Sequence, residues 1–229
     1  MAIELTWLGH GTWLIETAGK RIVLDPFLDE NPSAPVKSGE IQADYLLVSH
    51  GHFDHVADAA AIANRTGATV VANYEITAWL QAKHAVQNVV GMNLGGGVQL
   101  PFGHGKMTLA FHSSMLPDGS NGGNPGGFLL TLDGGKRIYF ACDTAVFEDM
   151  RRIGAPGIDL AVLPIGDLFT MGPEDSIEAV RLLLPTRVAP AHYNTWPPIA
   201  QDAQAWAESV RRSTAAEPIV IQPGEKITV

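Results

Sequence analysis

The sequence has little of several features that mark common protein classes. It contains one cysteine in 229 residues, which excludes a disulfide within the chain and is typical of a reducing compartment. No window reaches the ~18 consecutive apolar residues that span a bilayer, and the first residues lack the basic and apolar segments of a signal peptide. These absences predict a cytoplasmic protein that has no membrane partner.

Positive charge is also scarce. The chain has 15 lysines and arginines against 24 aspartates and glutamates, which gives a net charge of −9. Nucleic-acid backbones require basic stripes, so long DNA or RNA is not an expected partner. Hydrophobic residues make up 46% and charged residues 17%, which is typical of a globular protein with a core. We expect one domain over residues 1–229, and self-association into a homo-oligomer stays open.

The most informative segment is His-Gly-His-Phe-Asp-His at residues 50–55. An apolar run precedes it, which places the motif in the loop at the carboxyl end of a buried strand. In extended backbone His50 and His52 point the same way and can bind one cation, whereas Asp54 and His55 diverge and can reach a second. Imidazole suits zinc, and a mixed nitrogen and oxygen set also admits manganese or iron. The alternatives are a His-rich surface loop and buried histidines without a cation. Burial without a cation would leave polar groups unpaired.

Three more candidate ligands stand at the ends of predicted strands. They are His112, Asp143 and His192, and each directly follows an apolar run. The predicted strands cover residues 107–111, 137–142 and 187–191. The carboxyl ends of strands are where α/β sheets collect functional groups. Any one of these residues alone can be a cap or a turn residue, but four such strand ends in one chain favour a common site.

The remaining pattern predicts a mixed α/β (α+β) fold. Hairpins dominate at the start and after residue 127, whereas strands alternate with helices in the middle. Helices are expected at 56–65, 74–85, 144–153 and 200–212, and another opens at residue 173. The polar segment 29–40 and the glycine-rich segment 116–127 are expected to be loops beside the metal edge.

The order of these residues resembles the metallo-β-lactamase superfamily of metal-dependent hydrolases. The likeness rests on His-x-His-x-Asp-His followed by His112, Asp143 and His192, and it extends over essentially the whole chain. The segments 6–11, 24–27, 119–127 and 191–196 are similar to a branch of small bacterial hydrolases that resembles the ascorbate-phosphate lactonases. The resemblance implies a four-layer αββα sandwich with metals at one edge, between the sheets.

The resemblance also implies a role for each candidate ligand. His50, His52 and His112 would hold a first metal, Asp54, His55 and His192 would hold a second, and Asp143 would bridge both. Asp25 matches an early aspartate of the family that would orient a ligand histidine from behind. Cys142 stands where this branch usually has glycine. We interpret it as a small core residue, and a soft extra ligand is the alternative.

Several other side chains are candidates for contact with a substrate. His10 is either a substrate-side group or a structural hydrogen-bonding residue. Tyr193, Asn194 and Trp196 follow a candidate ligand, so they are expected to line the substrate pocket, and simple packing explains Trp196 nearly as well. His84 is expected to lie at the surface.

Together these features predict a metal-dependent hydrolase that acts on a small molecule. Two divalent ions, in the first instance zinc, can share a bridging water and bring its pKa towards about 7, and the resulting hydroxide would attack a carbonyl or phosphorus. Asp54 would accept or relay a proton. Cleavage of an ester or lactone is the first hypothesis. The alternatives are a phosphodiesterase for a small phosphate ester and a metal-bound binding or regulatory module without turnover.

Overall fold

Two seven-stranded β-sheets form the centre of the protein in a computed structural model that describes residues 2–229. The strand order is β14-β1-β2-β3-β4-β5-β6 in the first sheet and β13-β12-β11-β10-β9-β8-β7 in the second. The first sheet comprises β1 (Glu4–Trp7), β2 (Trp13–Thr17), β3 (Lys20–Leu24), β4 (Tyr45–Leu47), β5 (Thr69–Asn73), β6 (Val89–Met92) and β14 (Lys226–Thr228). The second comprises β7 (Gly97–Leu100), β8 (Gly103–Leu109), β9 (Gly126–Thr131), β10 (Arg137–Phe140), β11 (Leu160–Pro164), β12 (Arg187–Ala191) and β13 (Glu217–Pro218).

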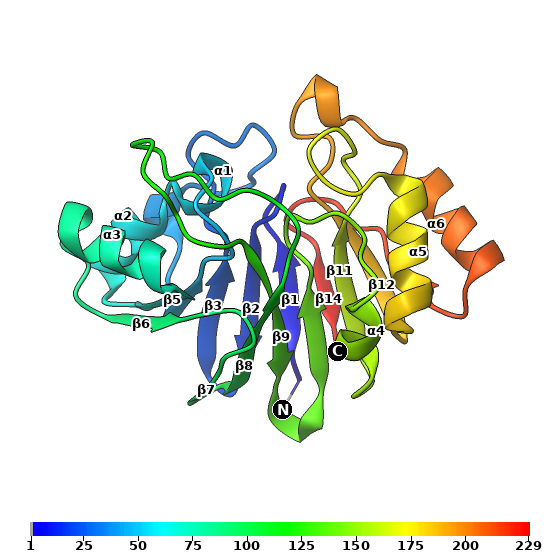
Figure 1. Ribbon diagram of the computed structural model, residues 1–229, viewed down its shortest axis with the longest axis horizontal. Helices are drawn as coiled ribbons and strands as arrows, with labels where there is room; N and C mark the ends of the chain where they lie inside the picture. The colour runs from blue at the N-terminus through cyan, green and yellow to red at the C-terminus, as the bar shows by residue number, and fades with distance from the viewer. Residues whose placement is uncertain (1) are drawn as a thin grey trace.

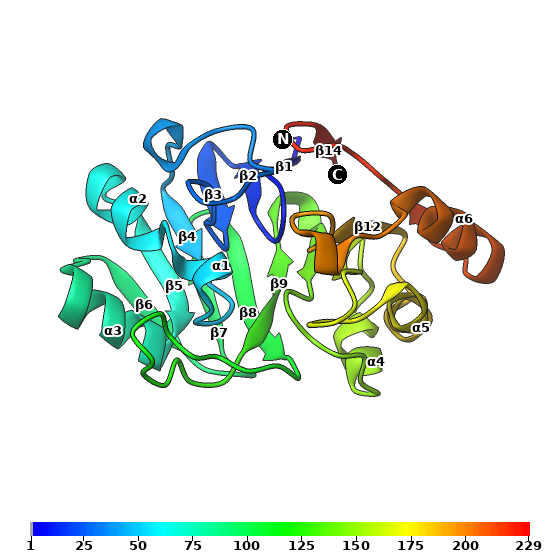
Figure 2. The same cartoon turned by 90° about the horizontal axis from the view of Figure 1, so that it is seen from above.

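Helices cover the outer faces of the two sheets, as Figures 1 and 2 show. Beside the first sheet lie α1 (Phe53–Val56), α2 (Ala59–Thr66) and α3 (Tyr74–His84). Beside the second lie α4 (Met150–Gly154), α5 (Pro173–Leu183) and α6 (Ala203–Ser213). Short 3-10 helices occur at Ser38–Glu40, Asp133–Gly135 and Pro197–Ile199. The predicted four-layer αββα arrangement is therefore confirmed. None of the helices within residues 2–229 is long and apolar enough to span a bilayer.

The apolar runs of the sequence become strands that are buried on both faces. In β4, Leu46 packs with the helices outside the first sheet, whereas the next residue, Leu47, packs between the two sheets. Because successive strand residues face opposite sides, a strand covered on both sides needs a continuous apolar run instead of an alternating one. Trp13 and Phe140 meet in the core between the sheets, with ring centroids 6.3 Å apart. Burial from both sides thus fixes the strands whose ends carry the functional side chains.

Strand direction brings the candidate ligands to one edge. The strands β3, β4 and β5 are parallel, as are β10, β11 and β12, and β8 runs in the direction of β10 because both are antiparallel to β9. The carboxyl ends of these strands therefore lie at the same edge of the sandwich, which is the upper edge in Figure 1. Asp25 follows β3 and His192 follows β12 directly, and the remaining candidates lie three to eight residues beyond the ends of their strands.

Two local predictions differ from the structure. The helix expected at 144–153 is much shorter, because α4 begins only at Met150. Thr144 Oγ1 accepts a hydrogen bond from Phe111 N at 2.9 Å, and Ala145 N donates to Phe111 O at 3.1 Å, so this part of the chain is tied to a neighbouring loop. The second difference is in the motif itself, where residues from Phe53 onward form the helical turn α1 instead of extended loop.

Candidate metal centre

The seven predicted ligands, together with His10, meet in three overlapping groups of donor atoms. Within the described part of the chain, the donor atoms of each group all lie within 4.8 Å of one another. The groups are His50, His52 and His112; His10, Asp54, His55 and His192; and His50, His55 and Asp143. The structure therefore brings together the residues that the sequence selected. Two of the groups contain the two sets of three that the family resemblance implies, and the third joins one histidine of each set to Asp143. Their role as metal ligands stays a prediction.

The first group is a convergence of three imidazoles. His52 Nδ1 lies 3.1 Å from His50 Nε2 and 3.2 Å from His112 Nε2. The other ring nitrogen of His52 lies 3.1 Å from Ser113 Oγ, which can accept its hydrogen and leaves the Nδ1 lone pair free. Three imidazole nitrogens within 4.8 Å of one another are a donor set that suits zinc or another divalent transition metal.

The second group combines the Asp54 carboxylate with the imidazoles of His10, His55 and His192. Asp54 Oδ2 lies 3.7 Å from His192 Nε2 and 3.8 Å from His55 Nε2. The turn of α1 places Asp54 and His55 on this side, while His52, at the N-cap, still has extended backbone and faces the first group. The change from extended to helical backbone inside the motif is thus what divides its four polar side chains between two groups.

Asp143 lies between the two groups. Its Oδ2 atom is 3.1 Å from His192 Nε2 and 3.3 Å from His55 Nε2, both in the second group. The same oxygen is 3.5 Å from His112 Nε2 and 3.9 Å from His50 Nε2, both in the first. A single carboxylate oxygen within reach of imidazoles from both groups has the position of a bridging ligand.

Buried polar atoms without partners test whether a cation fits this site. Among residues 2–229, His55 Nε2, Asp143 Oδ1 and both ring nitrogens of His192 are buried and have no hydrogen-bond partner. Where the imidazoles are neutral, leaving such atoms unpaired costs about 1–3 kcal/mol each. A cation that accepts lone pairs from imidazole and carboxylate would remove much of this cost, so the residues present fit a bound metal.

A hydrogen-bond network behind the cluster fixes two of the imidazoles. Asp25 Oδ2 lies 2.9 Å from His55 Nδ1 and accepts from the Ser49 hydroxyl at 2.7 Å. The same hydroxyl oxygen lies 2.9 Å from His50 Nδ1. Since a carboxylate only accepts, His55 carries its hydrogen on Nδ1, and by the same reasoning His50 donates from Nδ1 to Ser49. Both rings therefore present Nε2 to the cluster. Ser49 was missed from the sequence, although its place between an apolar run and His50 was a usable signal.

His10 is a structural part of the cluster. Its side chain is fully buried, with Nε2 3.0 Å from Asp54 Oδ2 and Nδ1 2.7 Å from Thr195 Oγ1. Its backbone oxygen accepts from His192 N at 3.1 Å and from Trp7 Nε1 at 3.0 Å. Of its two interpretations, the geometry favours the structural one: His10 orients Asp54 and holds the segment that carries His192.

Charge within the cluster is divided between protonated and neutral imidazoles. Burial alone would lower the pKa of His192, but the nearby Asp143 carboxylate raises it to about 9. Burial likewise opposes protonation of His55, and Asp143, Asp54 and Asp25 together raise its pKa well above the usual value. Burial lowers the pKa of His50 well below its usual value. Without a cation, the site is thus held together by imidazolium–carboxylate pairs, and a metal must displace those protons.

Several site residues have backbone conformations that favour glycine. The φ angles are +53° at His10, +45° at Asp25, +54° at Cys142 and +54° at His192. Such angles cost an ordinary residue roughly 1–2 kcal/mol, so the network described above must stabilise them. At Cys142 this explains why glycine suits the position. Burial raises the pKa of the Cys142 thiol and keeps it neutral, which agrees with a core residue better than with a metal ligand.

A cavity of about 720 Å³ opens onto the cluster. Its floor includes His52, Asp54, His112, Asp143 and His192. Trp196 lines this cavity as predicted, whereas Tyr193 and Asn194 do not. Tyr193 is buried and stacks on Trp7 with ring centroids 5.3 Å apart, and Asn194 accepts a hydrogen bond from Gln201 N. The prediction that Tyr193 and Asn194 line the substrate pocket is therefore wrong for this cavity. The loop at 116–127 reaches the cavity through Leu116 and Pro117, and segment 29–40 does not line it.

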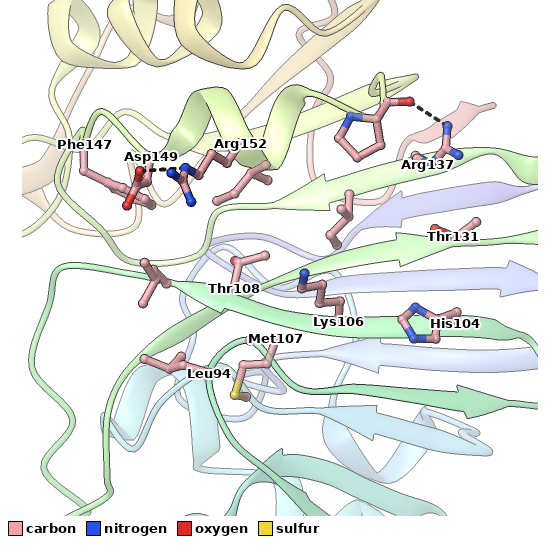
Figure 3. Close-up of a pocket in the computed structure, with 15 residues that line it drawn as sticks. Leu94, His104, Lys106, Met107, Thr108, Thr131, Arg137, Phe147, Asp149 and Arg152 are labelled. Atoms are coloured by element: carbon pink, nitrogen blue, oxygen red, sulfur yellow. Dashed lines mark hydrogen bonds and ion pairs between the residues drawn. The ribbon is translucent and has the colours of Figure 1, made fainter.

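A second cavity, of about 470 Å³, lies on the outer face of the second sheet beside α4 (Figure 3). Three cationic side chains line it, namely Lys106, Arg137 and Arg152. Arg152 is paired with Asp149 at 3.5 Å, and Arg137 donates to the backbone oxygen of Pro156 at 2.8 Å. None of the candidate ligands lines this cavity, so it is separate from the candidate metal centre.

Known proteins are similar to this chain in sequence and in fold over nearly its full length. The family model for the beta-lactamase superfamily domain matches residues 20–193. A UPF0173 metal-dependent hydrolase from Thermus thermophilus is 49% identical over 223 residues, which is 97% of each chain. Another from Thermococcus kodakarensis is 45% identical over 98% of this chain and 99% of its own. The structure of Igni18, a metallo hydrolase from Ignicoccus hospitalis, aligns with a TM-score of 0.90 and 34% identity over 100% of this chain and 99% of its own.

Proposed function

This chain belongs to the beta-lactamase superfamily and is a metal-dependent hydrolase, and we propose that it uses two divalent cations to cleave an ester or lactone bond in a small molecule. The observation that carries this proposal is the position of Asp143. Its Oδ2 lies within 3.1–3.9 Å of imidazole nitrogens from both groups, as a carboxylate shared by two cations would. A site for one cation would need neither the second group nor a shared oxygen.

Three side chains from each of the first two groups would hold one cation. His50, His52 and His112 would hold the first, and Asp54, His55 and His192 the second, with Asp143 shared. Zinc suits this nitrogen-rich set best, and manganese or iron are the alternatives. Bound divalent ions of this kind bring the pKa of a water molecule towards about 7 and polarise the substrate oxygen.

The remaining chemistry falls to side chains of the protein. Asp54 lines the cavity, and nearby imidazoles hold its pKa below the usual range against the opposing effect of burial, so it stays ionised. As a carboxylate it can take up the proton that the nucleophilic water gives up and pass it to the leaving group. His10 keeps the Asp54 carboxylate in place through its hydrogen bond at 3.0 Å. Asp25 and Ser49 keep the rings of His55 and His50 turned towards the cluster.

Turnover before and after metal removal tests the proposal. Purified protein would be assayed against a panel of small lactones, carboxylic esters and phosphodiesters, then treated with a chelator and reconstituted with zinc, manganese or iron. We expect hydrolysis of at least one ester or lactone, loss of that activity on chelation and recovery on addition of metal. Preference for a phosphodiester would favour the phosphodiesterase alternative. Efficient cleavage of RNA or DNA that the Asp143→Ala variant loses would contradict the proposal.

A further inference from the structure

The cavity over the candidate metal centre has an apolar wall. Phe53, Met115, Phe169 and Trp196 line it from four separate segments of the chain. Three of these side chains are unusually exposed for apolar residues, at 49% for Phe53, 61% for Met115 and 57% for Phe169. Isolated exposed apolar residues are common, but several of them around one cavity indicate a surface that becomes covered when a ligand binds.

The wall is built on well-anchored segments. Phe53 packs edge-on against Phe27, with ring centroids 5.7 Å apart, and Trp196 lies 5.9 Å from the same ring. The loop that carries Met115 is tied to the metal-binding motif through its neighbour Ser114, whose Oγ accepts from Gly51 N at 3.0 Å and donates to Gly122 O at 2.9 Å. Phe53, Trp196 and the loop that carries Met115 are therefore held in place relative to the cluster.

Cationic side chains are missing from this wall. No lysine or arginine within residues 2–229 lines the cavity. In contrast, Lys106, Arg137 and Arg152 line the separate cavity on the outer face of the second sheet (Figure 3). Recognition of a phosphate or carboxylate group typically uses arginine or lysine donors. An anionic group on the substrate would find such a partner only away from the candidate site.

We propose that the part of the substrate that does not react is an uncharged, apolar group, such as an acyl or alkyl chain, and that it lies along Phe53, Phe169 and Trp196. This inference rests on the proposed function, because it places the scissile ester or lactone bond at the polar floor of the cavity. Covering the exposed aromatic surface removes apolar area from water on both the ligand and the protein, which provides the binding free energy.

A series of acyl esters with one leaving group tests this substrate class. For the metal-loaded protein, kcat/KM would be measured for p-nitrophenyl acetate, butyrate, hexanoate and octanoate, and for bis(p-nitrophenyl) phosphate. We expect kcat/KM to rise by about fourfold for each added methylene that is buried, and to be lowest for the phosphodiester. In Phe169→Ala the dependence of kcat/KM on chain length should flatten, because octanoate hydrolysis should lose more than acetate hydrolysis does. Tyr74→Ala, which truncates an aromatic residue that is 66% exposed outside the cavity, is the matched control.

Binding of 1-octanol separates this inference from the proposed function, because octanol has no bond to hydrolyse. Calorimetric titration should give binding to the wild type and to Tyr74→Ala, and at least fivefold weaker binding to Phe169→Ala. If octanol binds in this way but no ester is hydrolysed, the proposed function fails and the apolar substrate wall stands. If the acetate and octanoate esters react equally well and octanol does not bind, the wall has no such role, although a metal-dependent esterase would remain.

Discussion

Asp25 and Ser49 are joined by two hydrogen bonds of 2.7 Å, one from the Ser49 backbone N–H to Oδ1 and one from its hydroxyl to Oδ2. Asp25 is also hydrogen-bonded to His55, and Ser49 is also hydrogen-bonded to His50. His50 belongs to the first group of the candidate metal centre and His55 to the second, and both also lie with Asp143 in the third. One buried carboxylate therefore sets the ring orientation of a histidine in each half of the site.

Replacing Ser49 with alanine should weaken metal binding. The change removes the acceptor for His50 Nδ1 and leaves that ring free to rotate or to change tautomer. Loss of a partner behind a metal ligand typically costs 10–100-fold in affinity. A competition titration with a chromophoric chelator measures this change. Ser209→Ala, at a partly exposed position of α6, is the control, and an affinity in Ser49→Ala equal to that of this control would contradict the proposed role.

Asp143→Ala should lose far more activity than Cys142→Ala or His84→Ala. Asp143 contacts imidazoles of both groups, whereas Cys142 lies against Phe140 and His84 packs on Trp79 at the end of α3. We expect Asp143→Ala to lower turnover by more than about 100-fold, which is more than the loss of a residue that only hydrogen-bonds a metal ligand causes. The other two variants should lower it by less than about threefold. Initial rates at saturating metal measure this. Near wild-type turnover in Asp143→Ala would remove the basis for a shared carboxylate.

The location of the site was largely predictable because its residues occupy one short motif and the ends of strands. The order and type of the polar residues identified the superfamily, and the comparisons confirm it. The αββα layers are likewise confirmed, since continuous apolar runs such as that of β4 need cover on both faces. These features depend on local pattern and strand direction, which a sequence displays directly.

Other features depend on contacts between distant parts of the chain. His10 bonds to Thr195, 185 residues away, so its structural role could not be inferred from its neighbours. Tyr193 and Asn194 follow a candidate ligand but do not line the cavity. The chain turns away from it there, because φ is +54° at His192 and +59° at Asn194. The helix expected from residue 144 begins only at Met150, because Thr144 is hydrogen-bonded to Phe111. Nearness in sequence to a candidate ligand therefore did not predict which side chains line the cavity where the backbone turns sharply.

Metal binding should release protons at pH 7. The pKa of His192 is raised to about 9 and that of His55 well above its usual value, so both are protonated without a cation, and both must become neutral to bind one. Calorimetric titration of chelated protein with zinc, in two buffers of different ionisation enthalpy, counts these protons. We expect release at pH 7 that falls as the pH rises past 9, and activity that declines below about pH 6 as protons compete more strongly. Equal enthalpies in the two buffers would exclude such release.

The chelated protein should become less stable as the pH rises from neutral to alkaline. His192 has a folded-state pKa of about 9 against 6.5 ordinarily, so its stabilising protonation is complete below pH 6.5 and is lost as the pH rises through 9. A shift of this size corresponds to a free energy of unfolding on the order of 3 kcal/mol. His10 acts in the opposite direction, because its pKa of about 4 makes stability fall as the pH drops from 6.5 towards 4.

Urea unfolding of the chelated protein at pH 6.5, 8 and 9.5 measures the alkaline loss. Asp143→Asn is the control, since it removes the carboxylate that raises the pKa of His192 and should flatten the dependence on pH. A free energy of unfolding that stays constant from pH 6.5 to 9.5 in the wild type would show that the imidazolium–carboxylate pair contributes nothing to stability.

The proposed hydrolysis depends on two cations acting together in one site. The most direct measurement is a titration of chelated protein with zinc, in which hydrolysis of a responsive ester or lactone is followed against equivalents of metal per chain. We predict no activity before metal is added and a plateau once two equivalents are bound. Full activity in chelated protein, or a plateau at one equivalent that more zinc does not change, would contradict it.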